Sequence, residues 1–103
     1  MPAVARGNGT DGINTFHGCT TYTTCSSCSV NVRANGIGVH RENDSNTSHT
    51  IRVGDSCPSH STTVIVGSPN VRVNGRGVAR VGDRYNNCGQ SVSGSPNVFA
   101  NGG

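Results

Sequence analysis

A repeated frame constrains what this chain can fold into more than any other feature of its sequence. Residues 29–41 and 68–80 share the frame S-x-N-V-R-x-N-G-x-G-V-x-R, and the two copies are offset by 39 residues. A third copy, SPNVFANGG, occupies residues 95–103, and a fainter echo links Val4-Ala5-Arg6 to Val78-Ala79-Arg80. Self-similarity of this kind indicates a structural unit that buries its apolar face against neighbouring copies.

Each copy of the frame predicts a β-hairpin. Its Asn-Gly dipeptide favours a two-residue type I′ turn, because both positions tolerate a positive φ. Alternating residues precede the turns, and return strands are expected at 38–41 and 77–80. A lone hairpin is marginal in water, so we expect three hairpins around a pseudo-threefold axis, sharing one core in a single domain of residues 1–103. The dipeptides are Asn35-Gly36, Asn74-Gly75 and Asn101-Gly102.

The composition removes other fold classes and favours an all-β chain. Hydrophobic residues make up 31%, against about 45–50% in an average globular domain, and Leu and Lys are absent. A helical bundle needs stripes of such residues, and no apolar run reaches the roughly 18 residues of a membrane helix. The opening MPAVAR lacks an apolar stretch, so we expect no signal peptide and synthesis in the cytoplasm. Because so small an apolar core is marginal by itself, we expect a metal, disulfides or a partner to stabilise the fold further.

The charge pattern argues against nucleic-acid binding, and the motifs argue against catalysis. The formal net charge is +3, and the arginines are spread along the chain with no basic run or aromatic platform beside them. Ser, His and Asp are all present, but there is no G-x-S-x-G elbow, and the His and Asp spacings follow the repeat. We therefore expect neither a nucleic-acid partner nor an enzyme.

The histidines and one cysteine follow the register of the repeat. The offset of 39 residues places His49 directly onto Cys88, and both residues come five positions after an aspartate. His60 likewise follows Asp55 by five positions, and His17 follows an aspartate by six. If a pseudo-threefold axis relates the hairpins, these equivalent loop positions converge at one end of the molecule. Three imidazoles and one thiolate form a closed tetrahedral site that suits a structural Zn²⁺, so the predicted metal ligands are His17, His49, His60 and Cys88.

A zinc ribbon is the competing interpretation of the same residue types. Cys25 and Cys28 form a CxxC, and Cys57 and His60 form a CxxH. Together they would make a Cys₃His site of a binding module. Against this set, Cys28 aligns with glycines that directly precede the serine of the repeat, which places it at a hairpin entrance.

The remaining histidine and cysteines have other expected roles. His40 aligns with Ala79 within a return strand and is interpreted as a strand side chain. Cys57 lies between two proposed ligands and is the best substitute for one of them. Cys19, Cys25 and Cys28 are expected to be thiols in a reducing cytosol, with a Cys19–Cys25 or Cys19–Cys28 bridge left open for later oxidation.

These motifs resemble the PAAR-repeat family. The resemblance rests on the opening MPAVAR, on two Val-x-Arg-x-x-Asp units at 39–44 and 78–83, and on GSPNVF at 94–99. It extends over essentially the whole chain. The chain departs from the Pro-Ala-Ala-Arg of the family name, since it has Gly-Val-His-Arg at 38–41 and Gly-Val-Ala-Arg at 77–80.

The resemblance implies a small conical, pseudo-threefold β-structure with one zinc near its vertex. It implies a non-enzymatic tip of a membrane-piercing spike in a contractile injection machine, either a phage tail or a type VI secretion system. The base of the cone would cap a trimeric β-helical spike protein, one chain per trimer, with only transient contact with the target membrane. No small-molecule substrate is implied, and the location would be a virion tail tip or a secreted spike tip. Carried over by position, the zinc ligands are again His17, His49, His60 and Cys88.

Overall fold

The computed structural model describes residues 2–15, 19–86 and 88–100. In these ranges the regular structure consists of short antiparallel strands without a helix, as an all-β chain requires. Accordingly, the described residues offer no helix long and apolar enough to cross a bilayer. The strands are β1 (Gly12–Asn14), β2 (Tyr22–Thr24), β3 (Arg33–Ala34), β4 (Ile37–Gly38), β5 (His49–Thr50), β6 (Ser59–His60), β7 (Arg72–Val73), β8 (Arg76–Gly77) and β9 (Gln90–Ser91).

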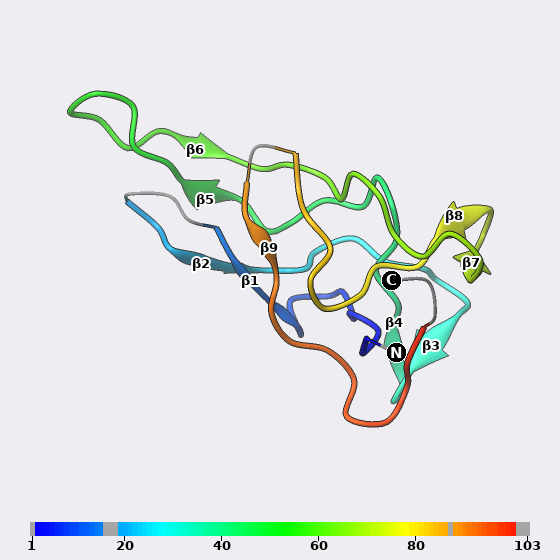
Figure 1. Ribbon diagram of the computed structural model, residues 1–103. Coiled ribbons are helices and arrows are strands. Elements are labelled where there is room, and N and C mark those ends of the chain that lie inside the picture. Colours follow the sequence, from blue (N-terminus) through cyan, green and yellow to red (C-terminus); the bar gives the residue numbers. More distant parts are fainter. Residues whose placement is uncertain (1, 16–18, 87, 101–103) are drawn as a thin grey trace.

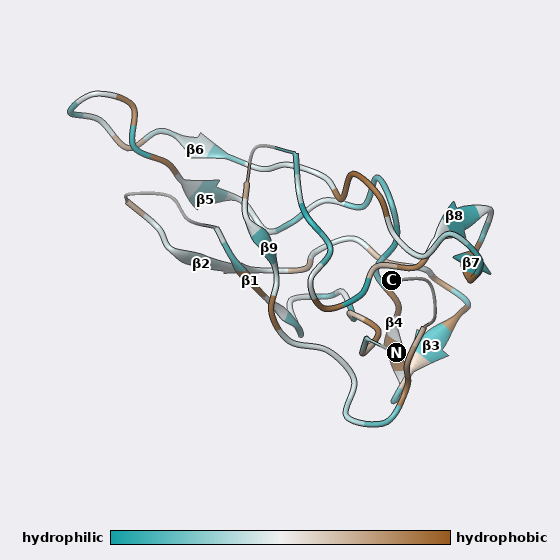
Figure 2. Cartoon of the chain, in the orientation of Figure 1, coloured by the Kyte–Doolittle hydropathy of each residue, from teal (hydrophilic) through white to brown (hydrophobic). Residues whose placement is uncertain are grey.

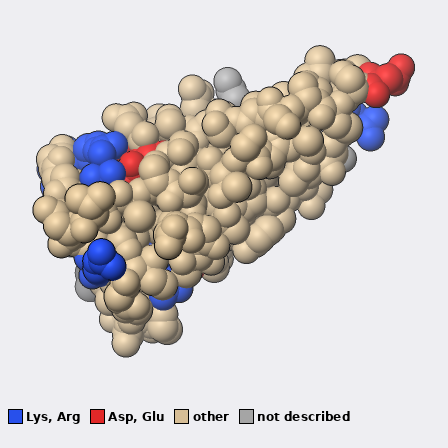
Figure 3. Space-filling model, turned by 180° about the vertical axis from the view of Figure 1, so that it is seen from behind, with Lys and Arg blue, Asp and Glu red and all other residues tan. Residues whose placement is uncertain are grey.

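The molecule is an elongated cone. Its extents are 41 × 24 × 23 Å, and it narrows toward the hairpin of β5 and β6, while the hairpins β3–β4 and β7–β8 lie at the broad end (Figure 1). The sheet β2-β1-β9 lies beside the β5–β6 hairpin, with β1 antiparallel to both of its neighbours. Seen from behind, arginine side chains gather mainly at the broad end (Figure 3). The conical fold class is therefore the one that the repeat and the family resemblance predict.

Two of the predicted hairpins form with the predicted turn. β3 pairs with β4, and β7 pairs with β8, each across an Asn-Gly dipeptide. Asn35 and Gly36 have φ angles of 57° and 78°, and Asn74 and Gly75 have 55° and 80°. Two successive positive φ values define the type I′ turn, whose twist matches that of the flanking strands. The third dipeptide, Asn101-Gly102, lies outside the described residues.

A closed ring of backbone hydrogen bonds forms the pseudo-threefold axis. The amide of Ala5 donates to the carbonyl of Ala79 at 2.9 Å, Ala79 donates to His40 at 2.8 Å, and His40 donates to Ala5 at 3.0 Å. All three residues are at most 1% exposed. The faint echo at residues 4–6 is thus a third strand of this ring, equivalent to the strands at 39–41 and 78–80. Single β-bridges flank the ring in cyclic order, namely Arg6 to Val39, Arg41 to Val78 and Arg80 to Val4.

In each copy, an arginine on a strand of the ring forms an ion pair with an aspartate in the loop that follows that strand. We call each of these ion pairs a clip. In the clip of Arg41, the backbone N–H and Nε–H both donate to Oδ2 of Asp44, at 2.9 and 2.7 Å, and Nη2 donates to Oδ1 at 3.0 Å. The same bonds recur in the other two copies. This bidentate geometry explains why the frame carries Arg and not Lys. The pairs are Arg6 with Asp11, Arg41 with Asp44, and Arg80 with Asp83.

Serines at the hairpin entrances join one repeat to the next. Each serine Oγ accepts the backbone N–H groups two and three residues further on. The Oγ of Ser29 also donates to the turn residue Asn74 at 2.7 Å, and that of Ser95 donates to Asn35 at 2.6 Å. The turn of one hairpin is therefore tied to the entrance of another. The three entrance serines are Ser29, Ser68 and Ser95.

The apolar interior consists of two small clusters of mostly Val and Ala. One cluster underlies the hairpins at the broad end and comprises Val4, Ala34, Val39, Val73, Val78 and Ala100. The other extends toward the narrow end and comprises Ala5, Ile13, Cys25, Val64, Ala79, Tyr85 and Cys88. Neither cluster includes a residue of the β5–β6 hairpin, and residues 52–59 of that hairpin are all exposed. The narrow end therefore needs support other than hydrophobic burial.

Protonation of Asp44 is expected to destabilise the fold in acid. Burial opposes its ionisation, but the hydrogen bonds and charge of Arg41 outweigh it and lower its pKa. Because the folded pKa is the lower one, Asp44 contributes its full stability above the unfolded pKa of about 3.9 and loses it as the pH falls further. Asp44→Asn should lower the free energy of unfolding by about 3 kcal/mol at pH 7. In urea unfolding at a series of pH values, the variant should also lose less stability in acid than the unmodified chain does, and we call this acidic part of the stability curve the acid limb.

The exposed Asp55, which forms no ion pair with any described residue, supplies the matched control. Asp55→Asn should leave both the midpoint at pH 7 and the acid limb as they are in the unmodified chain. If Asp44→Asn and Asp55→Asn gave the same titration curve, the clip would carry none of the stability assigned to it.

Candidate metal centre

The two histidines of the β5–β6 hairpin lie directly opposite each other. His49 and His60 are paired residues in the antiparallel ladder, so their side chains leave the hairpin on the same face. Their Nε2 atoms are 2.9 Å apart, and the rings meet edge to face with centroids 4.5 Å apart. His49 is buried, whereas His60 keeps partial exposure. This pairing aims two imidazole nitrogens at a single point.

Cys88 completes a three-residue cluster from a distant part of the chain. Its Sγ lies 3.0 Å from Nε2 of His49, and the ligand atoms of all three residues lie within 4.8 Å of one another. Gly89 has a φ of 63°, and a Cβ there would come within 1.7 Å of the carbonyl oxygen of Asn14. Only glycine fits at that position, so the backbone beside Cys88 is held tightly against β1.

A backbone carbonyl fixes the tautomer of His49. Nδ1 of His49 lies 2.8 Å from the carbonyl oxygen of Thr47, which can only accept a hydrogen bond. The proton therefore resides on Nδ1, and the lone pair of Nε2 faces Cys88 and His60. Thr47 is itself held by its amide, which donates to the carbonyl of Thr24 at 2.8 Å. A histidine oriented in this way by a second group is the usual arrangement of a metal ligand.

Donors also surround the sulfur of Cys88. Nδ2 of Asn46 lies 3.6 Å from Sγ, and Asn46 is fixed because its Oδ1 accepts the amide of Thr62 at 2.9 Å. Burial raises the pKa of the Cys88 thiol, and hydrogen bonds from Thr62 and Asn46 partly offset that effect. A bound metal would displace the thiol proton, and these donors would then stabilise the thiolate. One thiol and two imidazoles form a donor set that suits zinc.

Three of the four predicted ligands are therefore brought together. His49, His60 and Cys88 meet at the narrow end, as the register of the repeat predicts. His17 lies outside the described residues, so the complete four-residue site remains a prediction. The group of His49, His60 and Cys88 can hold a metal ion.

The interpretation of His40 as a strand side chain agrees with the structure, and its partners explain why. His40 is fully buried on the pseudo-threefold axis, with Nδ1 2.7 Å from the carbonyl oxygen of Ser27 and Nε2 hydrogen-bonded to the hydroxyl of Tyr85. Burial lowers the pKa of His40 and keeps the imidazole neutral. The Tyr85 hydroxyl also lies 3.5 Å from Sγ of Cys25, whose pKa burial raises to about 12. Cys25 is thus a core thiol.

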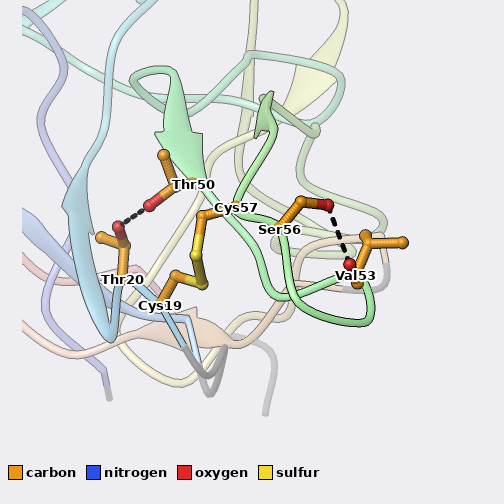
Figure 4. Close-up of a disulfide and its surroundings, with 6 residues drawn as sticks. All are labelled: Cys19, Thr20, Thr50, Val53, Ser56 and Cys57. Carbon is orange, nitrogen blue, oxygen red and sulfur yellow. Dashed lines mark hydrogen bonds between the residues drawn. A yellow bond between two sulfur atoms is a disulfide. The ribbon is translucent and has the colours of Figure 1, made fainter.

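The disulfide of this chain differs from both bridges considered from the sequence. Cys19 pairs with Cys57, and neither Cys25 nor Cys28 takes part (Figure 4). The expectation of a free Cys19 and that of Cys57 as a substitute ligand are therefore wrong. The zinc-ribbon interpretation is wrong as well, because Cys57 is in the disulfide and Cys25 lies in the core.

One signal in the sequence could have indicated this bridge. Cys19 and Cys57 are 38 residues apart, one residue less than the offset of the repeat. They therefore lie within one position of equivalence in successive copies. The bridge links the loop after β1 to the apical loop, which we define as residues 51–58 between β5 and β6. Beside the bridge, Thr20 of the first loop is hydrogen-bonded to Thr50 at the end of β5 (Figure 4).

Comparison with known proteins supports the family resemblance. Residues 53–103 match the family model described as the PAAR motif. The match begins in the apical loop and includes His60, Cys88, the second hairpin and the third copy of the frame. The comparison with curated proteins gives no match.

Proposed function

This chain belongs to the PAAR-repeat family, and on that premise we propose that it is the tip of a spike in a contractile injection machine, either a phage tail or a type VI secretion system. Its broad end would cap a trimeric β-helical spike protein, one chain per trimer. Its narrow end would carry one structural Zn²⁺ held by His17, His49, His60 and Cys88. It would act at a virion tail tip or as a secreted spike tip.

Three equivalent valines are the observation that carries the capping role. Val32, Val71 and Val98 each follow the asparagine of a repeat and are 39%, 38% and 37% exposed. A single chain thus presents nearly the same half-exposed apolar group three times around one axis. Such a surface matches the three identical ends of a trimer, whose unpaired strand edges would otherwise be exposed to aggregation.

The chemistry of the narrow end supports a mechanical role. A site closed by four protein ligands leaves no coordination position for water, so its metal stabilises structure and activates no nucleophile. The disulfide and the metal would together stiffen a hairpin that has little apolar packing of its own. A stiff, narrow apex concentrates force on the target membrane, which it meets only in passing. No enzymatic activity is proposed.

Mass measurement of a reconstituted complex tests the capping role. The purified chain is mixed with candidate trimeric β-helical spike proteins, and native mass spectrometry should find one chain per trimer. Val71→Asp should weaken that complex at least tenfold, because it places a charge at the centre of the apolar contact.

The control replaces an exposed valine of the apical loop. Val53 is 54% exposed at the narrow end, so Val53→Asp should leave binding to the spike unchanged. Two or three chains per trimer, or equal effects of the two substitutions, would contradict the proposal.

A further inference from the structure

One flank of the cone, beside the second copy of the repeat, carries a hollow. The hollow has a volume of about 300 Å³, and we call it the lateral hollow. It lies beside the hydrophobic segment between β6 and β7, which is visible as a brown stretch in Figure 2. Ile65 and Val66 in this segment are 55% and 59% exposed. The lining residues are Ile65, Val66, Arg80, Gly82, Asp83 and Arg84.

The repeat shows what normally fills this position. In the first copy, Oγ of Ser27 accepts the backbone N–H of Ser45, the residue directly after the clip aspartate, at 2.8 Å. In the third copy, Oγ of Ser93 accepts the N–H of Gly12, again directly after a clip aspartate, at 2.7 Å. Val66 occupies the corresponding place in the second copy, two residues before the entrance serine, and its side chain cannot accept a hydrogen bond.

Replacement of serine by valine removes the side-chain acceptor for the backbone N–H of Arg84. Among the described residues, nothing accepts the backbone N–H of Arg84 or that of Val66. The amide of Ile65 donates to the carbonyl of Arg84 at 3.1 Å, which keeps the two segments side by side. Asp83 is neutralised by Arg80 at 2.9 Å, so the exposed Arg84 guanidinium gives the hollow a net positive charge. The hollow therefore presents hydrogen-bond donors, one cation and an apolar wall.

We propose that the lateral hollow binds an extended, acidic and apolar peptide segment of a partner protein. Acceptors of that segment would take up the N–H groups of Arg84 and Val66, its carboxylate would pair with the Arg84 guanidinium, and its aliphatic side chains would cover Ile65. In the described parts of the other two copies, Ser27 and Ser93 take up the corresponding N–H groups themselves, so the proposal assigns the site to the second copy. This inference goes beyond the capping role, because it assigns a partner to one flank of a tip whose base meets a threefold spike.

The repeat supplies the matched variant for the test. The probe is a fluorescein-labelled, blocked pentapeptide, Ile-Ser-Asp-Val-Ile, added to the ¹⁵N-labelled full-length chain. It should bind with a millimolar or lower Kd and shift the amide signals of Val66 and Arg84 most. Val66→Ser restores the residue type of the other two copies and should weaken binding at least tenfold without disturbing the rest of the spectrum. A peptide with Lys in place of Asp should also bind at least tenfold more weakly.

Two further variants separate the proposal from non-specific binding. Arg84→Gln should abolish the preference for the acidic peptide while keeping the fold. Val30 is 85% exposed elsewhere on the surface, so Val30→Ser should leave the Kd unchanged. The proposal fails if no binding occurs at millimolar peptide, if the shifts centre on other residues, or if Val66→Ser and Val30→Ser bind equally well.

Discussion

Removal of the metal from this chain is expected to open its narrow end and to lower Tm by at least about 20 °C. Structural zinc contributes about 10–16 kcal/mol in small metal-binding domains, which is comparable to the whole stability of a domain. Here the ladder between β5 and β6 has two residue pairs, and residues 52–59 are exposed, so little apart from the metal and the Cys19–Cys57 bridge would hold that hairpin. A loss of 5 kcal/mol or more corresponds to the stated shift in Tm for about 100 residues.

Calorimetry with and without a chelator measures this effect, and hydrogen exchange locates it. Exchange should accelerate first in residues 49–60 and around Cys88, and later at the ring of Ala5, His40 and Ala79. His49→Ala and Cys88→Ser should each abolish the binding of one metal per chain. His40→Gln should reduce stability and still bind one metal, since His40 is a core residue. A chelated protein that melted at the temperature of the untreated one would refute the structural role of the metal.

Reduction of the Cys19–Cys57 bridge is expected to lower the free energy of unfolding by about 4 kcal/mol. This value follows from the entropy of closing a loop of 38 residues in the unfolded chain. The bridge and the metal act on the same end of the molecule through different residues, so the reduced protein should still bind one metal. The combination Cys19→Ser with Cys57→Ser should reproduce the effect in urea unfolding without any reductant.

A cysteine outside the bridge provides the control for this prediction. Cys28 is free and half-buried, and Cys28→Ser should leave the difference between the oxidised and the reduced protein unchanged. Release of the metal on reduction would show instead that the metal site depends on the bridge, and would contradict the independence of the two.

The hairpins and the axis could be predicted because they depend on local chemistry. An Asn-Gly dipeptide between alternating residues specifies its own turn, and the φ angles of Asn35 and Asn74 follow from it. The offset of 39 residues predicts that His49 and Cys88 occupy equivalent positions in successive copies. In the structure, Nε2 of His49 lies 3.0 Å from Sγ of Cys88. Residues 4–6 could be assigned to the ring because they repeat the pattern of residues 78–80.

The disulfide and the lateral hollow were not predicted from the sequence, because both depend on contacts between copies of the repeat. Cysteine spacing alone does not determine which cysteines form a disulfide, and the nearby CxxC makes Cys25 and Cys28 the nearest possible partners of Cys19 in the sequence. Only the fold shows that Cys25 lies in the core beside Tyr85. The exchange of serine for valine at position 66 gains meaning once Ser27 and Ser93 are seen to accept a backbone N–H.

X-ray absorption at the zinc edge tests the central claim most directly, because it counts the ligands around the bound ion in the intact chain. Three imidazole nitrogens and one sulfur predict three scatterers at about 2.0–2.1 Å and one at about 2.3 Å. His60→Ala should remove one nitrogen scatterer or abolish binding, and Cys88→Ser should remove the only sulfur. A first shell with two or more sulfurs, or a sulfur that persists in Cys88→Ser, would contradict the account.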